Sequence, residues 1–212
     1  MQLSSTSLLN WIWEKIVLDK QLLRKIMKEK RLALTSQTFS LYNQQILSKV
    51  LTHPRVQKAK IIGCYVSLPR EVDTLAIIQT LLLHKRVCVP KVEGSQMNFY
   101  EIHSLDELHS GCFHVLEPVT SHFIEPGDID CMLVPLLAYD QNNYRVGYGK
   151  GYYDRYFQRN FHGYKMGLAF SFQYVDHIDY DDRRSLELAY GLFQESLREN
   201  LSISVIVRCI KD

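Results

Sequence analysis

The spacing of apolar residues near the start of the chain predicts two consecutive helices. Over residues 10–34, apolar side chains recur every four positions at Leu18, Leu22 and Ile26, and charged residues occupy another face. A second stripe predicts a helix over residues 36–51, and its members are Phe39, Tyr42, Ile46 and Val50. Each helix is therefore expected to bury one face and expose the other.

From residue 61 onward, short apolar runs alternate with segments of helical character. Strands are expected at residues 61–67, 87–90, 97–102, 132–137, 165–170 and 202–209. A helix is expected after Asp73 and Thr74, because a side-chain oxygen there can accept from free N–H groups of the first turn, and another over residues 151–161. This alternation is typical of a mostly parallel sheet with helices on both faces. The sequence predicts an α/β fold, a three-layer αβα sandwich of Rossmann-like type, in one domain spanning residues 1–212.

Composition and charge narrow the classes of function. Of the 212 residues, 46% are hydrophobic and 23% are charged, with a formal net charge of +2. Such a balance does not indicate a chain built mainly to neutralise nucleic-acid phosphates. No apolar run approaches the ~20 residues of a membrane-spanning helix, and the first basic residue, Lys15, does not fit a signal or transit peptide. We expect a cytoplasmic monomer whose partners are small molecules, not nucleic acids or membranes.

The cysteines do not indicate a metal or redox motif. There are five of them, widely spaced and without a CxxC pair: Cys64, Cys88, Cys112, Cys131 and Cys209. In a reducing compartment a free cysteine behaves as a small hydrophobic residue. We therefore expect buried thiols.

The candidate chemistry concentrates in a glycine-rich loop that follows an apolar strand and leads into a helix. Alternate glycines at Gly147, Gly149 and Gly151 allow the backbone to turn tightly and to point successive N–H groups into one concavity. The N-terminus of the next helix adds a partial positive charge, and Arg145 and Lys150 add full charges. Because ligands of open α/β sheets bind beyond the carboxyl ends of strands, this pattern predicts a polyphosphate site.

The two common phosphate-binding motifs do not fit this loop. A Walker A motif needs Ser or Thr after its lysine, whereas Gly151 follows Lys150, and the dinucleotide fingerprint needs glycine where Tyr152 stands. The loop could instead be a structural turn whose glycines only relieve strain. Asp154, one turn into the helix, suits Mg²⁺, which takes one or two carboxylates plus phosphate oxygens, or it could simply satisfy the helix dipole.

The segment Arg145–Arg155 resembles the signature of the 5-formyltetrahydrofolate cyclo-ligase (5,10-methenyltetrahydrofolate synthetase) family. Further segments resemble that family in the same order: Lys20–Arg24, Ser67–Thr74, Val89–Pro90, Met97–Tyr100, Glu117–Pro118 and Ala169–Gln173. The resemblance extends over residues 20–173. It leaves residues 1–19 as an N-terminal extension and residues 174–212 as a divergent C-terminal segment.

The resemblance implies an enzyme that closes 5-formyltetrahydrofolate to 5,10-methenyltetrahydrofolate while ATP, a co-substrate, becomes ADP and phosphate. Transfer of the γ-phosphoryl group to the formyl oxygen would give an iminium phosphate, and attack by N10 would then close the ring and release phosphate. The protein must align the formyl oxygen with the γ-phosphorus and neutralise the developing charge. Mg²⁺ is the implied cofactor.

The resemblance also implies roles for individual residues. Lys150 and Arg145 would be catalytic, and Asp154 would hold Mg²⁺. The ATP site would comprise Lys20, Arg24, Arg145, Gly147, Gly149, Lys150, Gly151 and Tyr153. The folate site would comprise Val66, Glu71, Tyr148 and Tyr152. There, the Glu71 carboxylate would accept hydrogen bonds from pterin N–H groups. Without the resemblance, Lys20, Arg24 and Glu71 could simply be solvated.

After Gln173 the sequence departs from the family pattern. Where the family has an aspartate that serves as a second metal ligand, this chain has Arg184, which cannot bind a cation. Asp181 or Asp182 could replace it. The departure leaves open a non-catalytic nucleotide- or folate-binding homologue. An RNA-associated module is disfavoured, because basic residues are not interleaved with aromatic ones.

Overall fold

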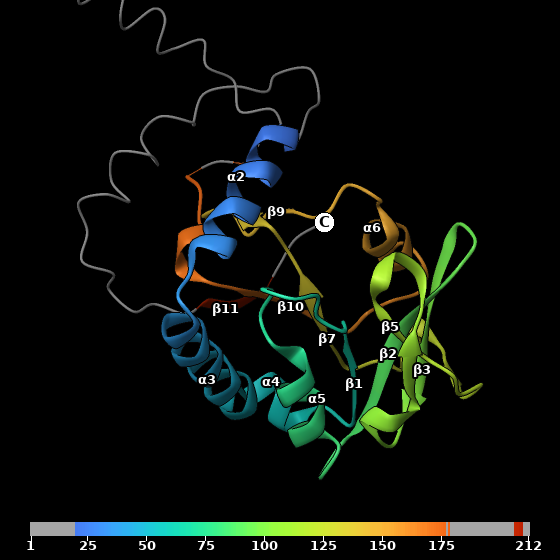
Figure 1. Cartoon of the computed structure of the whole chain (residues 1–212). Coiled ribbons are helices and arrows are strands. Elements are labelled where there is room, and N and C mark those ends of the chain that lie inside the picture. Colours follow the sequence, from blue (N-terminus) through green and yellow to red (C-terminus); the bar gives the residue numbers. More distant parts are fainter. Residues whose placement is uncertain (1–19, 177, 179–205, 210–212) are drawn as a thin grey trace, which may run out of the picture.

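A seven-stranded sheet forms the centre of the computed structural model, which describes residues 20–176, 178 and 206–209 (Figure 1). The strand order is β11-β10-β7-β1-β2-β3-β6. The bounds are β1 (Ile61–Cys64), β2 (Arg86–Glu93), β3 (Gln96–Ile102), β6 (Phe123–Ile124), β7 (Cys131–Pro135), β10 (Tyr164–Ala169) and β11 (Ile206–Cys209). Strands β10, β7, β1 and β2 run parallel, whereas β11 pairs antiparallel with β10, β3 with β2, and β6 with β3.

Short elements complete the fold around this sheet. Two small antiparallel pairs are formed by β4 (Leu108–Ser110) with β5 (Leu116–Pro118) and by β8 (Ala138–Tyr139) with β9 (Arg145–Val146). The helices are α2 (Lys20–Ala33), α3 (Ser36–Thr52), α4 (Pro54–Lys58), α5 (Thr74–Leu81) and α6 (Tyr152–Phe157). Single 3₁₀ turns occur at η1 (Leu105–Glu107), η2 (Cys112–His114), η3 (Pro126–Asp128) and η4 (Ser171–Gln173).

Helices lie on both faces of the sheet, which confirms the predicted α/β layers (Figure 1). On one face, α3 and α5 bury Ile46 and Ile77 against the parallel strands. On the other face, α6 packs on β3, where the rings of Tyr156 and Phe99 lie 4.9 Å apart between centroids. Burial of apolar surface on both sides explains why the central strands read as continuous apolar runs.

The predicted helix starts agree with the observed caps. The Asp73 carboxylate accepts from the N–H groups of Leu75 and Ala76 and so begins α5. The hydroxyl of Thr35 accepts from the Thr38 N–H and begins α3. These local hydrogen bonds satisfy donors that have no partner inside the helix.

The predicted apolar stripe of the first helix is wrong by one position. Leu22 is 42% exposed, and the buried residues of α2 are Leu23, Met27 and Arg31. This face packs on the β8–β9 pair through an apolar cluster that includes Val146. The helix is rotated so that its arginines reach the loop after β9. The part of the predicted helix before residue 20 lies outside the described residues.

Several element boundaries also differ from the sequence-based expectation. Strand β2 is longer than residues 87–90, because it forms a hairpin with β3 whose turn contains Gly94 at φ +64°. Helix α6 ends at Phe157, not at residue 161, and the first strand ends at Cys64. Of the run 202–209, the structure describes residues 206–209, which form β11.

The expectation of buried thiols is confirmed at three of the described cysteines and wrong at one. Cys64, Cys88 and Cys131 are buried in the sheet, and burial raises the pKa of the first two thiols. Cys112 is exposed because it begins the η2 turn outside the sheet.

Among the described helices, none combines the length and apolarity needed to cross a bilayer.

Gln173 holds the carboxyl ends of β7 and β10 together. Its side chain is fully buried, donates to the carbonyl oxygens of Leu136 and Leu137 at 3.0 Å each, and accepts from the Phe170 N–H at 3.0 Å. This position therefore satisfies three backbone groups that water cannot reach.

Replacing Gln173 with leucine should lower the free energy of unfolding by about 2–4 kcal/mol, because three buried backbone groups lose their partners. Urea denaturation followed by circular dichroism would measure the change. The matched control is Gln44→Leu on the exposed face of α3, expected to stay within about 0.5 kcal/mol of wild type. Equal effects of the two substitutions would contradict this account of Gln173.

Candidate active site

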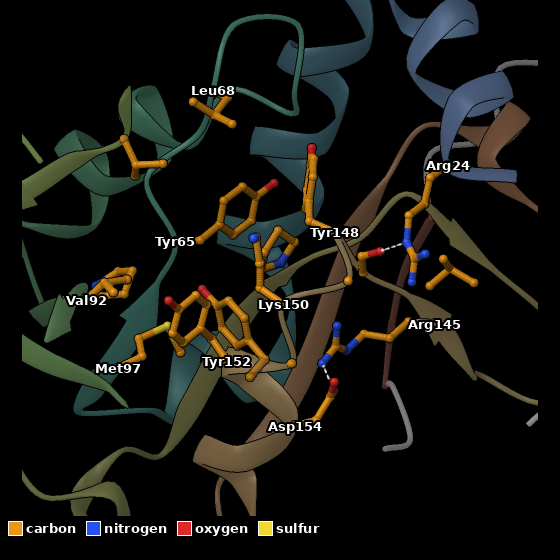
Figure 2. Close-up of a pocket in the computed structure, with 18 of the residues that line it drawn as sticks. Arg24, Tyr65, Leu68, Val92, Met97, Arg145, Tyr148, Lys150, Tyr152 and Asp154 are labelled. Atoms are coloured by element: carbon orange, nitrogen blue, oxygen red, sulfur yellow. Dashed lines mark hydrogen bonds and ion pairs between the residues drawn. The ribbon is translucent and has the colours of Figure 1, made fainter. Parts of the chain in front are cut away.

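A cavity of about 700 Å³ lies at the carboxyl ends of β1 and β7, within the usual size range of small-molecule sites (Figure 2). Tyr65 and Val66, directly after β1, and Pro135, at the end of β7, contribute to its wall. Every residue predicted for ATP, folate or metal lines this cavity: Lys20, Arg24, Val66, Glu71, Arg145, Gly147, Tyr148, Gly149, Lys150, Gly151, Tyr152, Tyr153 and Asp154. The structure thus brings together residues from distant parts of the chain.

The glycine loop connects β9 to α6 and needs glycine at two positions for conformational reasons. Gly149 has φ +93° and Gly151 has φ +67°, in the left-handed region that other residues rarely adopt. A Cβ on Gly149 would lie 3.3 Å from Arg24 Cζ, so this glycine also permits close approach of α2. Because α6 has only six residues, the positive charge of the site comes mainly from side chains.

Two arginines define the cationic side of the cavity (Figure 2). Arg24 Nε donates to the Gly147 carbonyl oxygen at 2.8 Å, which fixes α2 to the loop. Arg145 pairs with Asp154 and lies over the ring of Tyr153, with Cζ 5.8 Å from the centroid. The Arg145 side chain is 7% exposed and that of Asp154 is 59% exposed, so the aspartate faces outward while the arginine is held against the protein.

Two buried polar atoms beside the cavity lack a hydrogen-bond partner within the described part of the chain. They are Nε of Arg145 and the hydroxyl oxygen of Tyr153. Burial raises the pKa of Tyr153 well above its ordinary value, so its hydroxyl is neutral and can donate. Because buried polar groups are normally paired, these atoms point to a polar ligand in the cavity.

Glu71 is buried, which contradicts the interpretation of this residue as a solvated loop carboxylate. Its Oε2 accepts from the Leu68 N–H at 2.9 Å, and its Oε1 accepts from the Tyr148 hydroxyl and from Arg31 Nη1, at 3.4 Å for the latter. Burial raises the pKa of this carboxyl, while the Leu68 N–H and Arg31 act in the opposite direction. The carboxylate is therefore a preorganised acceptor at one end of the cavity.

Sequence reasoning missed Arg31, which lies behind Glu71 and is 5% exposed. A signal was present, because this arginine follows Leu23 and Met27 at four-residue spacing and continues their buried stripe. An arginine at such a position has to be paired. The predicted stripe of Leu18, Leu22 and Ile26 does not include this position.

Sequence reasoning also missed Arg155, which ties the glycine loop to the β2–β3 hairpin. Its Nη1 donates to the Lys150 carbonyl oxygen at 3.0 Å, and its Nη2 donates to the Ser95 carbonyl oxygen at 3.2 Å. Its guanidinium also lies over the Tyr152 ring, 5.1 Å from the centroid. The hairpin thereby limits the positions available to Lys150 and Tyr152.

A divalent cation would find one suitable carboxylate here. Within the described ranges, no group of three His, Cys, Asp or Glu side chains gathers to hold a metal ion. Asp154 is exposed and lies at the cationic loop, where ligand phosphates could supply the other oxygens. It therefore fits Mg²⁺ bound with a polyphosphate and not alone. The candidates for a second ligand, Asp181 and Asp182, lie outside the described residues.

Comparison with known proteins gives consistent matches over most of the chain. A model of the 5-formyltetrahydrofolate cyclo-ligase family matches residues 17–184. A 5-formyltetrahydrofolate cyclo-ligase of Mycoplasma genitalium is 31% identical over 167 residues, which cover 76% of this chain and 90% of the relative. The protein of that name from Mus musculus is 28% identical, and the match covers 84% of this chain and 94% of the mouse protein.

Solved structures show the same similarity. The structure of 5,10-methenyltetrahydrofolate synthetase from Aquifex aeolicus has a TM-score of 0.72 and 31% identity, and covers 91% of this chain and 93% of its own. The structure of 5,10-methenyltetrahydrofolate synthetase from Mycoplasma pneumoniae has a TM-score of 0.62 and 32% identity. The match covers 78% of this chain and 93% of the Mycoplasma chain. This chain is thus similar to both solved structures in fold and in sequence.

Proposed function

The chain belongs to the 5-formyltetrahydrofolate cyclo-ligase family, and on this premise we propose that its cavity binds 5-formyltetrahydrofolate and ATP together. The products are 5,10-methenyltetrahydrofolate, ADP and phosphate. The family resemblance and the enzymatic activity expected from the sequence are thus confirmed. No observation on the described residues favours the non-catalytic alternative.

The observation that carries the proposal is the presence of two complementary regions in one cavity. The glycine loop with Arg24, Arg145 and Lys150 is cationic and suits the phosphates of ATP. The buried Glu71 carboxylate and the rings around it form an acceptor with flat apolar surroundings, which suits a pterin. A cavity with both regions can hold a phosphoryl donor beside its acceptor.

The reaction needs alignment more than covalent participation by the protein. The formyl oxygen attacks the γ-phosphorus, the bond to the bridging oxygen of ADP breaks, and N10 then attacks the activated carbon. Ring closure releases the proton of N10 and expels phosphate, which carries the former formyl oxygen. Lys150 is proposed to contact the transferring phosphoryl group, where negative charge spreads as the bond breaks. Arg145, held by Asp154 and Tyr153, would bind phosphates that are not transferred.

Asp154 is proposed to hold Mg²⁺ together with phosphate oxygens of ATP. Bound there, the ion would neutralise phosphate charge. To bind the ion, Asp154 would have to share or release its hydrogen bond with Arg145. The Arg145 guanidinium would then turn toward the phosphates. The Nε of Arg145, which has no hydrogen-bond partner among the residues that the structure describes, supports a role in holding an anion.

The Glu71 carboxylate has limited capacity for pterin donors in the present arrangement. A carboxylate offers about four lone-pair sites, and donors already occupy three of them: Leu68 N–H, the Tyr148 hydroxyl and Arg31 Nη1. A donor–donor pterin edge would therefore displace the Tyr148 hydroxyl, while the tyrosine ring stays against the ligand.

The cytoplasmic location and the monomeric state expected from the sequence remain predictions.

The proposed reaction can be tested directly with purified protein. In the presence of ATP and Mg²⁺, 5-formyltetrahydrofolate should give the absorbance of 5,10-methenyltetrahydrofolate, with one ADP formed per ring closed. Omission of ATP or chelation of the metal should stop product formation. Binding of ATP without any product under several divalent metals would instead support the non-catalytic homologue.

The roles of Lys150 and Arg145 can be separated by removing each charge in turn. Lys150→Met should lower kcat roughly a hundredfold or more, because a preorganised charge at the transferring group stabilises the transition state more than bound ATP. Arg145→Met should mainly raise the KM for ATP. Steady-state kinetics with both substrates varied would give the two constants separately.

Lys58→Met on α4, outside the cavity, controls for the loss of one positive charge and should leave both constants unchanged. If Arg145→Met abolished kcat while Lys150→Met did not alter it, the two roles would be reversed. If neither substitution had an effect, the loop would be only a structural turn.

A further inference from the structure

Arg31 connects three segments that form the folate end of the cavity. Its Nη1 donates to the Tyr148 hydroxyl at 2.7 Å and to Glu71 Oε1 at 3.4 Å. Its Nη2 donates to the carbonyl oxygen of Leu136, directly after β7. One guanidinium thus joins the loop after β1, the glycine loop and the segment after β7, as its planar arrangement of donors allows.

Arg31 joins these three segments from behind the cavity wall. Glu71 and Tyr148 line the cavity wall, whereas Arg31 is not among the residues that line it. The side chains of Arg31 and Glu71 are each 6% exposed, so their attraction is little screened by water. Loss of one partner would leave the other as an uncompensated buried group. Arg31 is therefore placed to act on a substrate only through Glu71 and Tyr148.

The charges around Glu71 leave few alternatives to Arg31 as its counter-ion. Charged or titratable groups from several segments face the carboxylate: Arg31 and Lys28 of α2, Tyr65 after β1, Tyr148 of the glycine loop and Tyr153 of α6. Burial raises the pKa of Tyr65 and of Tyr153 well above their ordinary values, so both are neutral. Of the two cations, Lys28 is exposed and Arg31 is in contact.

We propose that Arg31 is a positioning residue for folate binding: it holds the Glu71 carboxylate and the Tyr148 ring in the arrangement that receives the pterin, without contact with the substrate. This inference rests on the proposed folate site. It assigns α2 two tasks, since Lys20 and Arg24 of the same helix lie at the phosphate end. The second task is carried by a residue outside the segments that resemble the family signature.

The test compares Arg31→Met, Arg31→Lys, Glu71→Gln and the Arg31→Met/Glu71→Gln double variant in the full chain. Arg31→Met should raise the KM for 5-formyltetrahydrofolate about tenfold or more, since a charged hydrogen-bond partner of the acceptor is lost. Glu71→Gln should have a similar selective effect. The KM for ATP should change much less in both. Lys25→Met, on the exposed face of α2, controls for loss of a charge from the helix.

The pH profile gives a readout that a purely structural role would not change. Burial raises the pKa of Glu71 and Arg31 opposes this, so removal of Arg31 should raise that pKa further. A protonated carboxyl is a poor acceptor. The folate affinity of Arg31→Met should therefore be weak at neutral pH and recover as pH rises. The ascending limb of kcat/KM for folate should move to higher pH than in wild type.

Arg31→Lys keeps the charge but lacks the planar fork that reaches Tyr148 and Leu136 together. It should raise the folate KM while its pH limb stays near that of wild type. If Arg31 acts through Glu71, the double variant should be little worse than Glu71→Gln alone. Circular dichroism would show whether each variant is folded, and if Arg31→Met is not, Arg31→Lys carries the test.

Three results would overturn the inference. They are equal changes in the KM values for folate and ATP in folded Arg31→Met, full additivity in the double variant, and an unchanged folate KM in Arg31→Lys. If wild type does not bind 5-formyltetrahydrofolate, the proposed function fails and this inference fails with it. If wild type and Glu71→Gln behave as described but Arg31→Met does not, only the role of Arg31 is rejected.

Discussion

The contact of helix α2 with the glycine loop is the constraint on which the rest of the site depends. Two arginines of one helix make it, Arg24 through the Gly147 carbonyl oxygen and Arg31 through the Tyr148 hydroxyl. The loop can accept this helix because Gly149 has no side chain at the point where Arg24 approaches. Apolar packing of α2 on the β8–β9 pair supplies the surface that keeps the arginines in place. The guanidinium groups of Arg24 and Arg31 and the loop backbone are thus fixed before any ligand binds, which reduces the reorganisation needed for catalysis.

The same contact divides the cavity between the two proposed substrates. Toward the start of α2, cationic side chains surround the loop backbone, and toward its end a buried ion pair presents a carboxylate. Gly147 and Tyr148, adjacent residues of the glycine loop, are contacted by different arginines of the helix. A shift of the helix would therefore disturb both regions together. Gln173 joins this network, because its amide and Arg31 both donate to the Leu136 carbonyl oxygen.

The sequence was sufficient to predict features that depend on neighbouring residues. The cap at Asp73, the strand runs and the glycine loop were predicted from local patterns, and the residues proposed for the site do line one cavity. Features that depend on contacts between distant residues were missed. Arg31 meets Tyr148 across 117 positions, and Arg155 meets Ser95 across 60. Local periodicity does not report such contacts, and it also placed the buried stripe of α2 one residue away from its true position.

The central claim is that one cavity aligns the formyl oxygen of the folate with the γ-phosphorus of ATP. The most direct measurement is a single-turnover reaction with 5-formyltetrahydrofolate labelled with ¹⁸O in its formyl group, followed by mass spectrometry of the released phosphate. Direct attack requires the formyl oxygen to leave with phosphorus, so the phosphate should carry one labelled atom for each ring closed. Unlabelled phosphate, with the label released into water, would contradict this account.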